Sequence, residues 1–175
     1  MKASFPIAAA MFLFVAAAPL LAQSDEEAEQ SYSLPPPVER CLSHGLGAKY
    51  RIDRSVNPFY LRGDFDGDGK SDYMTRIASR ENGKGGMLVC WGDRRKQPVV
   101  LGAGTNIRGP AGGVRVDELP MIGWSVYGTG AVEQGVGEGP PPKLTGEAVT
   151  IYATEGASGI LYWNGKAFRW YQQGD

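Results

Sequence analysis

Four closely spaced aspartates around a glycine-rich turn are the residues of this sequence best suited to chemistry. They are Asp64, Asp66, Asp68 and Asp72. Carboxylates crowded this closely repel one another unless a cation lies between them. Counted from Asp64, they occupy positions 1, 3, 5 and 9 of a loop with glycine at position 6, the spacing of an oxygen-ligand calcium loop.

The remaining loop positions fit the same interpretation. Gly69 allows the sharp turn that wraps an ion, and Lys70 contributes only its backbone carbonyl. Calcium is a hard cation that takes about six to eight oxygens, and no soft ligand is nearby. The predicted ligands of one calcium ion are Asp64, Asp66, Asp68, the carbonyl of Lys70, and Asp72. A solvated acidic turn that binds no ion is the alternative.

The segments that flank the loop have the composition of strands. Pro58–Arg62 leads into it and Tyr73–Ala78 leads out, and both are rich in aromatic or β-branched residues. Position 12 is Thr75, where a helix–loop–helix calcium hand has a bidentate glutamate. We therefore expect a strand–loop–strand site, in which calcium has a structural role because no helix pair opens and closes.

The loop resembles the calcium loop of FG-GAP/VCBS-type repeats, whose pattern is D-x-D-x-D-G-x-x-D. All five specified positions match. The resemblance implies a calcium ion in a β-hairpin loop, but it covers only Phe59–Tyr73. A propeller needs several blades and the chain has one copy, so the adhesion functions of propellers do not follow. The ending, Tyr162–Asp175, is similar to that of small bacterial exported proteins with one such loop, a likeness that implies no activity.

The first 22 residues are typical of a cleaved signal peptide, with Lys2, the apolar run Phe5–Leu21 and then Ala22. A transmembrane anchor is the alternative, which Pro19 and the lack of a basic flank disfavour. Cleavage leaves 17 basic and 19 acidic residues, a net charge of −2. Because the mature chain has no excess of positive charge, its composition does not favour nucleic acid or an anionic membrane surface as a partner. We expect a soluble exported protein, periplasmic or secreted.

Two cysteines, Cys41 and Cys90, remain in the mature chain. In an oxidising compartment the simplest expectation is one disulfide between them. Two free buried thiols are an alternative. A zinc site is a poorer one, because His44 is the only histidine and zinc takes three or four nitrogen or sulfur ligands.

The chain after the signal peptide predicts a flexible acidic, Pro-rich leader over residues 23–37 and one domain over residues 38–175. Val38–Leu46 has the apolar spacing of a short helix with Cys41 on its buried face. Asn164-Gly165 predicts a two-residue hairpin turn in which Leu161 pairs with Phe168. Further strands are predicted over 87–91, 98–101, 114–116, 120–127 and 146–151. The predicted fold class is α+β and predominantly antiparallel β, with one short N-terminal helix packed on a twisted sheet.

The sequence carries no catalytic signature, and we predict that the protein is not an enzyme. Ser43 and His44 are adjacent, so on a helix they do not face one another. A hydrolase is the least favoured alternative, because nothing sets any two carboxylates at the required separation. The carboxylates considered are Glu118, Glu133, Glu138 and Glu155. The basic trio Arg94-Arg95-Lys96 is interpreted as a solvated turn.

A binding or inhibitor module that acts on an envelope protein or a glycan is the main alternative to a purely structural calcium domain. Its contacts would come from the long loop 128–145, through residues such as Glu133 and Gln134, or from an aromatic face. The candidates for that face are Trp91, Trp124, Trp163 and Trp170. Because aromatic residues dominate small β cores, their burial or exposure distinguishes the two readings.

Overall fold

The computed structural model describes residues 33–107, 117–119, 121–136, 139–153 and 156–174. The predicted signal peptide at 1–22, the predicted leader up to residue 32 and the predicted strand at 114–116 lie outside these residues. The chain divides after Ser33, and almost everything described belongs to the unit Leu34–Asp175. Within the described ranges, no helix has the length and apolarity needed to span a membrane.

The N-terminal helix begins in the proline run and carries the first cysteine. It comprises α2 (Pro36–Cys41) and a wider turn, η1 (Leu42–Leu46). Prolines are tolerated here because the N–H groups of a first helical turn have no partner inside the helix. The helix starts two residues before the predicted Val38 and ends where predicted. Val38 and Cys41 are buried, which confirms the predicted face.

The first sheet is antiparallel and is centred on β3. Its strands are β1 (Tyr50–Ile52), β2 (Tyr60–Gly63), β3 (Asp72–Ser79), β4 (Gly85–Cys90) and β5 (Val99–Gly102). The order is β1-β3-β4-β5, and β2 pairs with the first half of β3 while β1 pairs with the second half. The acidic loop joins β2 directly to β3, so the predicted strand–loop–strand arrangement is present.

The second sheet is an antiparallel meander in the order β6-β7-β8-β9. Its strands are β6 (Gly123–Gly128), β7 (Ala148–Tyr152), β8 (Ser158–Trp163) and β9 (Phe168–Gly174). The strands expected at 120–127 and 146–151 correspond to β6 and β7. The second half of this sheet is the hairpin expected around Asn164-Gly165.

The predicted register of the final hairpin is wrong by two residues. Leu161 pairs with Trp170, not with Phe168, and Phe168 pairs with Trp163. The turn therefore has four residues, and the side chain of Asn164 closes it by accepting the N–H groups of Lys166 and Ala167. A shift of two leaves every side chain on its predicted face, because successive side chains alternate between the faces of a strand.

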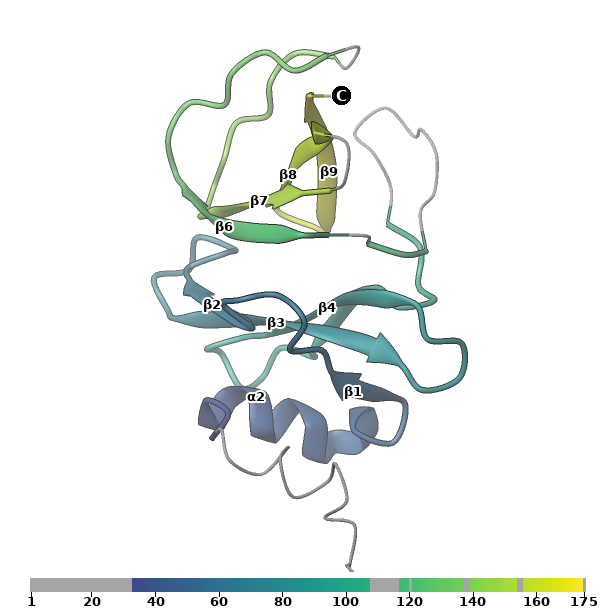
Figure 1. Cartoon of the computed structure of the whole chain (residues 1–175). Coiled ribbons are helices and arrows are strands. Elements are labelled where there is room, and N and C mark those ends of the chain that lie inside the picture. The colour runs from purple at the N-terminus through teal and green to yellow at the C-terminus, as the bar shows by residue number, and fades with distance from the viewer. Residues whose placement is uncertain (1–32, 108–116, 120, 137–138, 154–155, 175) are drawn as a thin grey trace, which may run out of the picture. The chain divides into compact units, whose positions relative to one another are not determined.

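The first sheet lies between the helix and the second sheet (Figure 1). One face packs on the helix through Val38, Cys41, Ile77, Leu88 and Cys90. The other face packs against the second sheet through residues that include Phe65, Met74, Val89, Trp124 and Leu161. The α+β, mainly antiparallel, single-domain fold class is confirmed, with the strands divided between two sheets.

Two of the four tryptophans belong to the core and the other two pack against it. Trp91 and Trp124 are 6% and 4% exposed, and Trp163 and Trp170 are partly buried against the same cluster. Trp91 also stacks on Phe168 at 5.8 Å between ring centroids, which connects the first sheet to the second. These residues therefore do not form the aromatic binding face considered from the sequence.

The predicted disulfide is present. Cys41 and Cys90 are bonded with their Cα atoms 6.1 Å apart, and 49 residues separate them in sequence. The bond joins α2 to the end of β4, so it fixes the helix on the first sheet. The alternatives of two free thiols and of a zinc site are thereby excluded for these cysteines.

Removal of this bond should lower the free energy of unfolding by roughly 3–4 kcal/mol, because closing a loop of this length restricts the unfolded chain. The measurement is urea unfolding of the oxidised protein against the Cys41→Ala/Cys90→Ala double variant. In a parallel test, unreduced denatured protein should not react with a thiol reagent. Reaction with two equivalents would contradict the bond.

A buried ion pair ties the first sheet to the chain that leads into β6. The guanidinium of Arg76 donates to Asp53 Oδ2 at 2.7 and 3.1 Å, and to the carbonyl of Met121 at 2.9 Å. The side chains of Arg76 and Asp53 are only 7% and 15% exposed. Burial acts to raise the pKa of Asp53, but hydrogen bonds from Ser55 and Arg76 outweigh it and the pKa is lowered.

Asp53→Asn should cost about 2–4 kcal/mol at pH 7, since it leaves the buried Arg76 guanidinium without its counter-charge. A lowered carboxyl pKa stabilises the fold above the pKa of the unfolded chain, and the benefit is lost as the pH falls through the folded value. The gap between wild type and variant should therefore shrink below about pH 4. Urea unfolding at pH 7 and pH 3 measures it.

The matched control is Asp117→Asn. Asp117 pairs with Lys84, but both side chains are over a third exposed, so the substitution should cost far less than Asp53→Asn does at pH 7. Equal losses for the two variants would contradict a special role of the buried pair.

Candidate metal site

Asp64 organises the backbone of the acidic loop. Its Oδ1 accepts the N–H groups of Gly67 and Asp68 at 2.9 and 3.0 Å, and its Oδ2 accepts that of Gly69 at 2.9 Å. The chain can fold around one carboxylate in this way because Gly67 and Gly69 have positive φ angles of 77° and 81°. The turn at Gly69 expected from the sequence is thus present.

Asp72, the first residue of β3, is the most buried acid of the loop. Its side chain accepts the N–H of Phe65 at 3.0 Å and that of Gly92 at 2.8 Å. Burial raises the pKa of Asp72 to about 6, and the nearby Asp66 and Asp68 charges act in the same direction. A cation beside this group would offset both effects, because it favours the ionised carboxylate.

Asp66 has a carboxylate oxygen that the protein does not satisfy. Its side chain is 5% exposed, and Oδ2 accepts a hydrogen bond from the ammonium of Lys96. Its Oδ1 is buried and has no hydrogen-bond partner within the described residues. Such groups are rare because burying an unpaired polar atom costs free energy, and one explanation is an ion that the oxygen ligates.

Three of the predicted ligands converge. Asp64, Asp66 and Asp72 each offer a carboxylate oxygen, and these oxygens lie within 4.8 Å of one another. This group can hold a metal ion, and it consists of hard oxygen donors alone. The orphaned oxygen of Asp66 belongs to the same group, so the residues present fit the ion that the sequence predicts.

Asp68 lies outside this group of three. Its Oδ2 is 2.8 Å from the Lys96 ammonium and 3.6 Å from that of Lys70. The N–H of Lys70 donates to Asp68 Oδ1, and the Lys70 side chain reaches Asp93 at 3.1 Å. Ligation by Asp68 and by the Lys70 carbonyl therefore stays a prediction.

The turn that follows β4, residues 92–96, was not assigned to the site from the sequence. Lys96 binds both Asp66 and Asp68, and these hydrogen bonds raise the pKa of Lys96. Asp93 is buried and pairs with Arg95 at 2.6 Å as well as with Lys70. The basic trio is exposed, as expected of a solvated turn, but Arg95 and Lys96 also form ion pairs that were not predicted from the sequence. The loop holds four aspartates and only one lysine, and this imbalance of charge was the sequence signal for a cation from elsewhere in the chain.

The second sheet supports the loop from the other side. Just before β7, the N–H of Glu147 donates to the carbonyl of Asp64, and Glu147 Oε2 accepts the N–H of Asp64, both at 2.7 Å. These residues are 83 positions apart. No sequence signal marks Glu147, because its place depends on how the two sheets pack.

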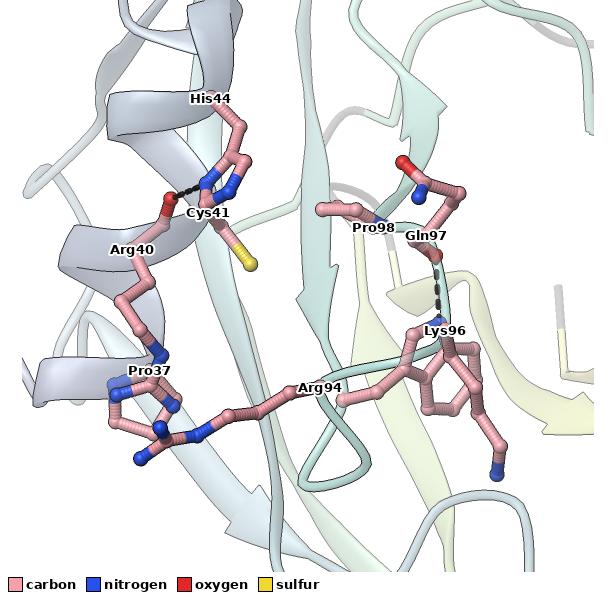
Figure 2. A pocket seen from close by; sticks show the side chains of 9 residues that line it. Pro37, Arg40, Cys41, His44, Arg94, Lys96, Gln97 and Pro98 are labelled. Atoms are coloured by element: carbon pink, nitrogen blue, oxygen red, sulfur yellow. Dashed lines mark hydrogen bonds between the residues drawn. The ribbon is translucent and has the colours of Figure 1, made fainter.

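Arg94, the first residue of the trio, lines a separate cavity of about 280 Å³ between the helix and the turn (Figure 2). The lining residues are Pro37, Arg40, Cys41, His44, Trp91, Arg94, Lys96, Gln97 and Pro98. Lys96 also binds Asp66 and Asp68, and Arg95 pairs with Asp93, so the three basic residues make different contacts.

The long loop 128–145 is held against β9 where it is described. The hydroxyl of Tyr171 accepts the N–H of Gly135 at 2.9 Å, and Gln173 donates to the carbonyl of Glu133 at 3.1 Å. Glu133 and Gln134, the candidate contacts on this loop, are exposed. Whether they contact a partner stays a prediction.

The side chains considered for catalysis do not assemble where they are described. Ser43 and His44 each hydrogen-bond the carbonyl of Arg40 instead of each other. Glu118 and Glu133 are exposed, while Glu138 and Glu155 lie outside the described residues.

In comparisons with known proteins, no family model, no curated protein and no solved structure matches the chain. The resemblance to FG-GAP/VCBS-type repeats therefore rests on the loop itself.

The two loop glycines should differ in their tolerance of alanine. At Gly67 an added Cβ would lie 2.2 Å from the Thr145 carbonyl oxygen, whereas at Gly69 it would meet nothing within 4 Å. Gly69→Ala should cost only the backbone strain of positive φ, about 1–2 kcal/mol. Gly67→Ala should cost clearly more, because backbone must also move. Urea unfolding in chelator measures both, and the reverse order would contradict the contact between loop and second sheet.

Proposed function

We propose that this protein is an exported, non-catalytic domain that binds one calcium ion in the 64–72 loop, where the ion stabilises the fold. The observation that carries the proposal is the buried, unpartnered Oδ1 of Asp66 within the Asp64–Asp66–Asp72 group. An ion at this place would satisfy that oxygen and neutralise part of the repulsion among the three carboxylates.

Calcium is the ion that this donor set favours. The three donors are carboxylates, which hard cations prefer, and zinc would want nitrogen or sulfur. The sulfur and nitrogen donors considered for zinc do not contribute to this site, since Cys41 and Cys90 form the disulfide and His44 hydrogen-bonds a backbone carbonyl. Magnesium demands a small, nearly ideal octahedron, whereas the loop has the calcium spacing along the sequence.

A stabilising role follows from where the loop lies. It joins β2 to β3 and contacts the second sheet through Glu147, so an ion there would hold strand ends and both sheets at one point. Export is supported by the signal-like first 22 residues and by the disulfide, which persists in oxidising compartments.

Millimolar calcium should raise the melting temperature of the mature protein relative to chelator, because an ion that binds only the folded state stabilises it by mass action. Calorimetric titration should give one ion per chain. Asp66→Ala should abolish both the shift and the binding heat while leaving a folded protein in chelator. Absence of a shift and of heat in the wild type would reject the site.

Lys96 offers a second arm of the same experiment, since its ammonium occupies Asp66 and Asp68 when no ion is present. Lys96 and a calcium ion bound at Asp66 Oδ1 would compete for the negative charge of the same carboxylate and repel one another, so Lys96→Met should bind calcium more tightly. Lys84→Met removes a partly exposed cation outside the loop and serves as the control for net charge. Weaker binding by Lys96→Met would contradict the competition.

A further inference from the structure

The cavity between the helix and the 91–98 turn is cationic. Four of its lining residues carry or can carry positive charge, namely Arg40, His44, Arg94 and Lys96, and none of its nine lining residues is acidic. The whole chain has a formal net charge of −1, so this concentration of bases does not follow from composition.

The two arginines have no internal partner. Within the described part of the chain, neither the Arg40 nor the Arg94 side chain takes part in a hydrogen bond or an ion pair. The adjacent Arg95 is paired with Asp93, and Lys96 with Asp66 and Asp68. Figure 2 shows the Arg40 and Arg94 side chains extending toward the Pro37 end of the cavity. Like charges directed to one place favour an anion between them.

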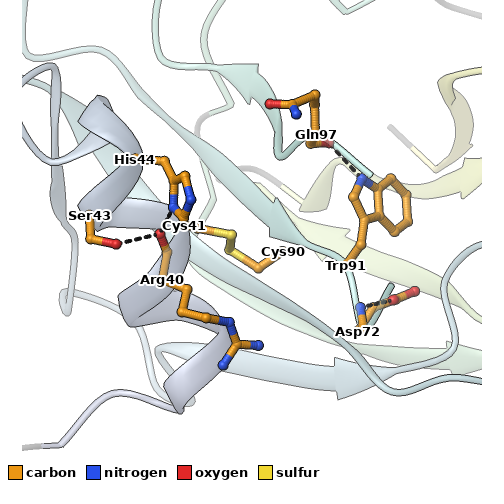
Figure 3. Close-up of a disulfide and its surroundings, with 9 residues drawn as sticks. Arg40, Cys41, Ser43, His44, Asp72, Cys90, Trp91 and Gln97 are labelled. Carbon is orange, nitrogen blue, oxygen red and sulfur yellow. Dashed lines mark hydrogen bonds between the residues drawn. A yellow bond between two sulfur atoms is a disulfide. The ribbon is translucent and has the colours of Figure 1, made fainter. Parts of the chain in front are cut away.

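The walls of the cavity are apolar and held in place. Pro37, Pro98 and Trp91 are apolar residues that line it, and the Trp91 indole N–H donates to the carbonyl of Gln97 at 2.9 Å. The Cys41–Cys90 disulfide joins the helix side to the strand that precedes Trp91 (Figure 3). Because the two walls are covalently tied, a ligand would meet a preformed site, which lowers the entropic cost of binding.

We propose that this cavity binds a small organic anion, in which a carboxylate or phosphate group meets Arg40 and Arg94 and an apolar body lies against Trp91 and the prolines. Guanidinium groups match both anions because they present paired donors in a planar fork. A volume of about 280 Å³ lies at the lower end of ligand pockets, which suits a single ring better than a polymer. The site does not depend on calcium.

The experiment is an NMR titration of the ¹⁵N-labelled mature protein in chelator, followed at the assigned Trp91 indole and Arg94 backbone resonances. The probes are benzoate and phenyl phosphate, with benzyl alcohol as the uncharged match. At least one anion should shift these signals saturably, and benzyl alcohol should not at equal concentration. The anion that binds more tightly identifies the preferred head group.

Variants decide whether the cavity is responsible. Arg94→Gln and Arg40→Gln should each weaken binding about tenfold or more, as expected for loss of a charge-assisted hydrogen bond. Arg95→Gln is the matched control, since Arg95 is the next residue, is 87% exposed and pairs with Asp93, so binding should stay within about twofold. Thermal melts check that each variant is folded.

Three results would overturn the proposal. They are the absence of a saturable shift with either anion, equal binding of benzyl alcohol, and an equal loss in Arg94→Gln and Arg95→Gln. The last result would mean that diffuse positive charge attracts the probes. Since every titration is run in chelator, failure here would leave the proposed calcium site untouched.

Discussion

Electrostatic repulsion within the 64–72 loop is the constraint around which much of the structure is arranged. The negative charge of each carboxylate is accommodated in a different way. Asp64 is surrounded by backbone N–H groups, Asp72 is buried with a raised pKa, and Asp68 is neutralised by lysines. Asp66 is the exception, because one oxygen binds Lys96 while the other has no hydrogen-bond partner among the described residues. Backbone N–H groups and lysines offset most of the negative charge, and one oxygen of Asp66 is left over. This arrangement indicates a loop that suits a bound cation.

The supports of this loop come from two distant parts of the chain, which explains why its geometry depends on how the whole domain packs. The 92–96 turn supplies cations, Gly92 supplies an N–H to Asp72, and Glu147 anchors the backbone from the second sheet. The disulfide holds the helix on the opposite face of the first sheet and ends at β4, one residue before Trp91.

Local patterns made the fold class and the core of the site predictable. The spacing of Val38 and Cys41 predicted the buried face of the helix, and the two cysteines predicted their bond. The alternation in the last hairpin predicted the correct faces. Its register was missed because the side chain of Asn164 stabilises a four-residue turn in place of the two-residue one. Strand faces depend on a period of two, whereas register depends on details of the turn.

Apart from the disulfide, the sequence did not indicate which distant residues contact the loop or line the cavity. Glu147 lies 83 residues from Asp64, and Lys96 lies 28 from Asp68, so neither shares a local pattern with the loop. The cavity is also a product of tertiary structure, because Arg40 and Arg94 come from different elements. The signal peptide and the strand at 114–116 remain predictions, since they lie outside the described residues.

The three consecutive basic residues after β4 make different contacts, so their order in this turn matters as well as their total charge. Arg94 lines the cavity, Arg95 closes onto Asp93, and Lys96 spans the two loop aspartates. Moving the lysine to position 94 or 95 would preserve composition, net charge and hydropathy, yet it would change the head group at two of the three positions. In related chains, a basic trio in a different order would therefore not be an equivalent one.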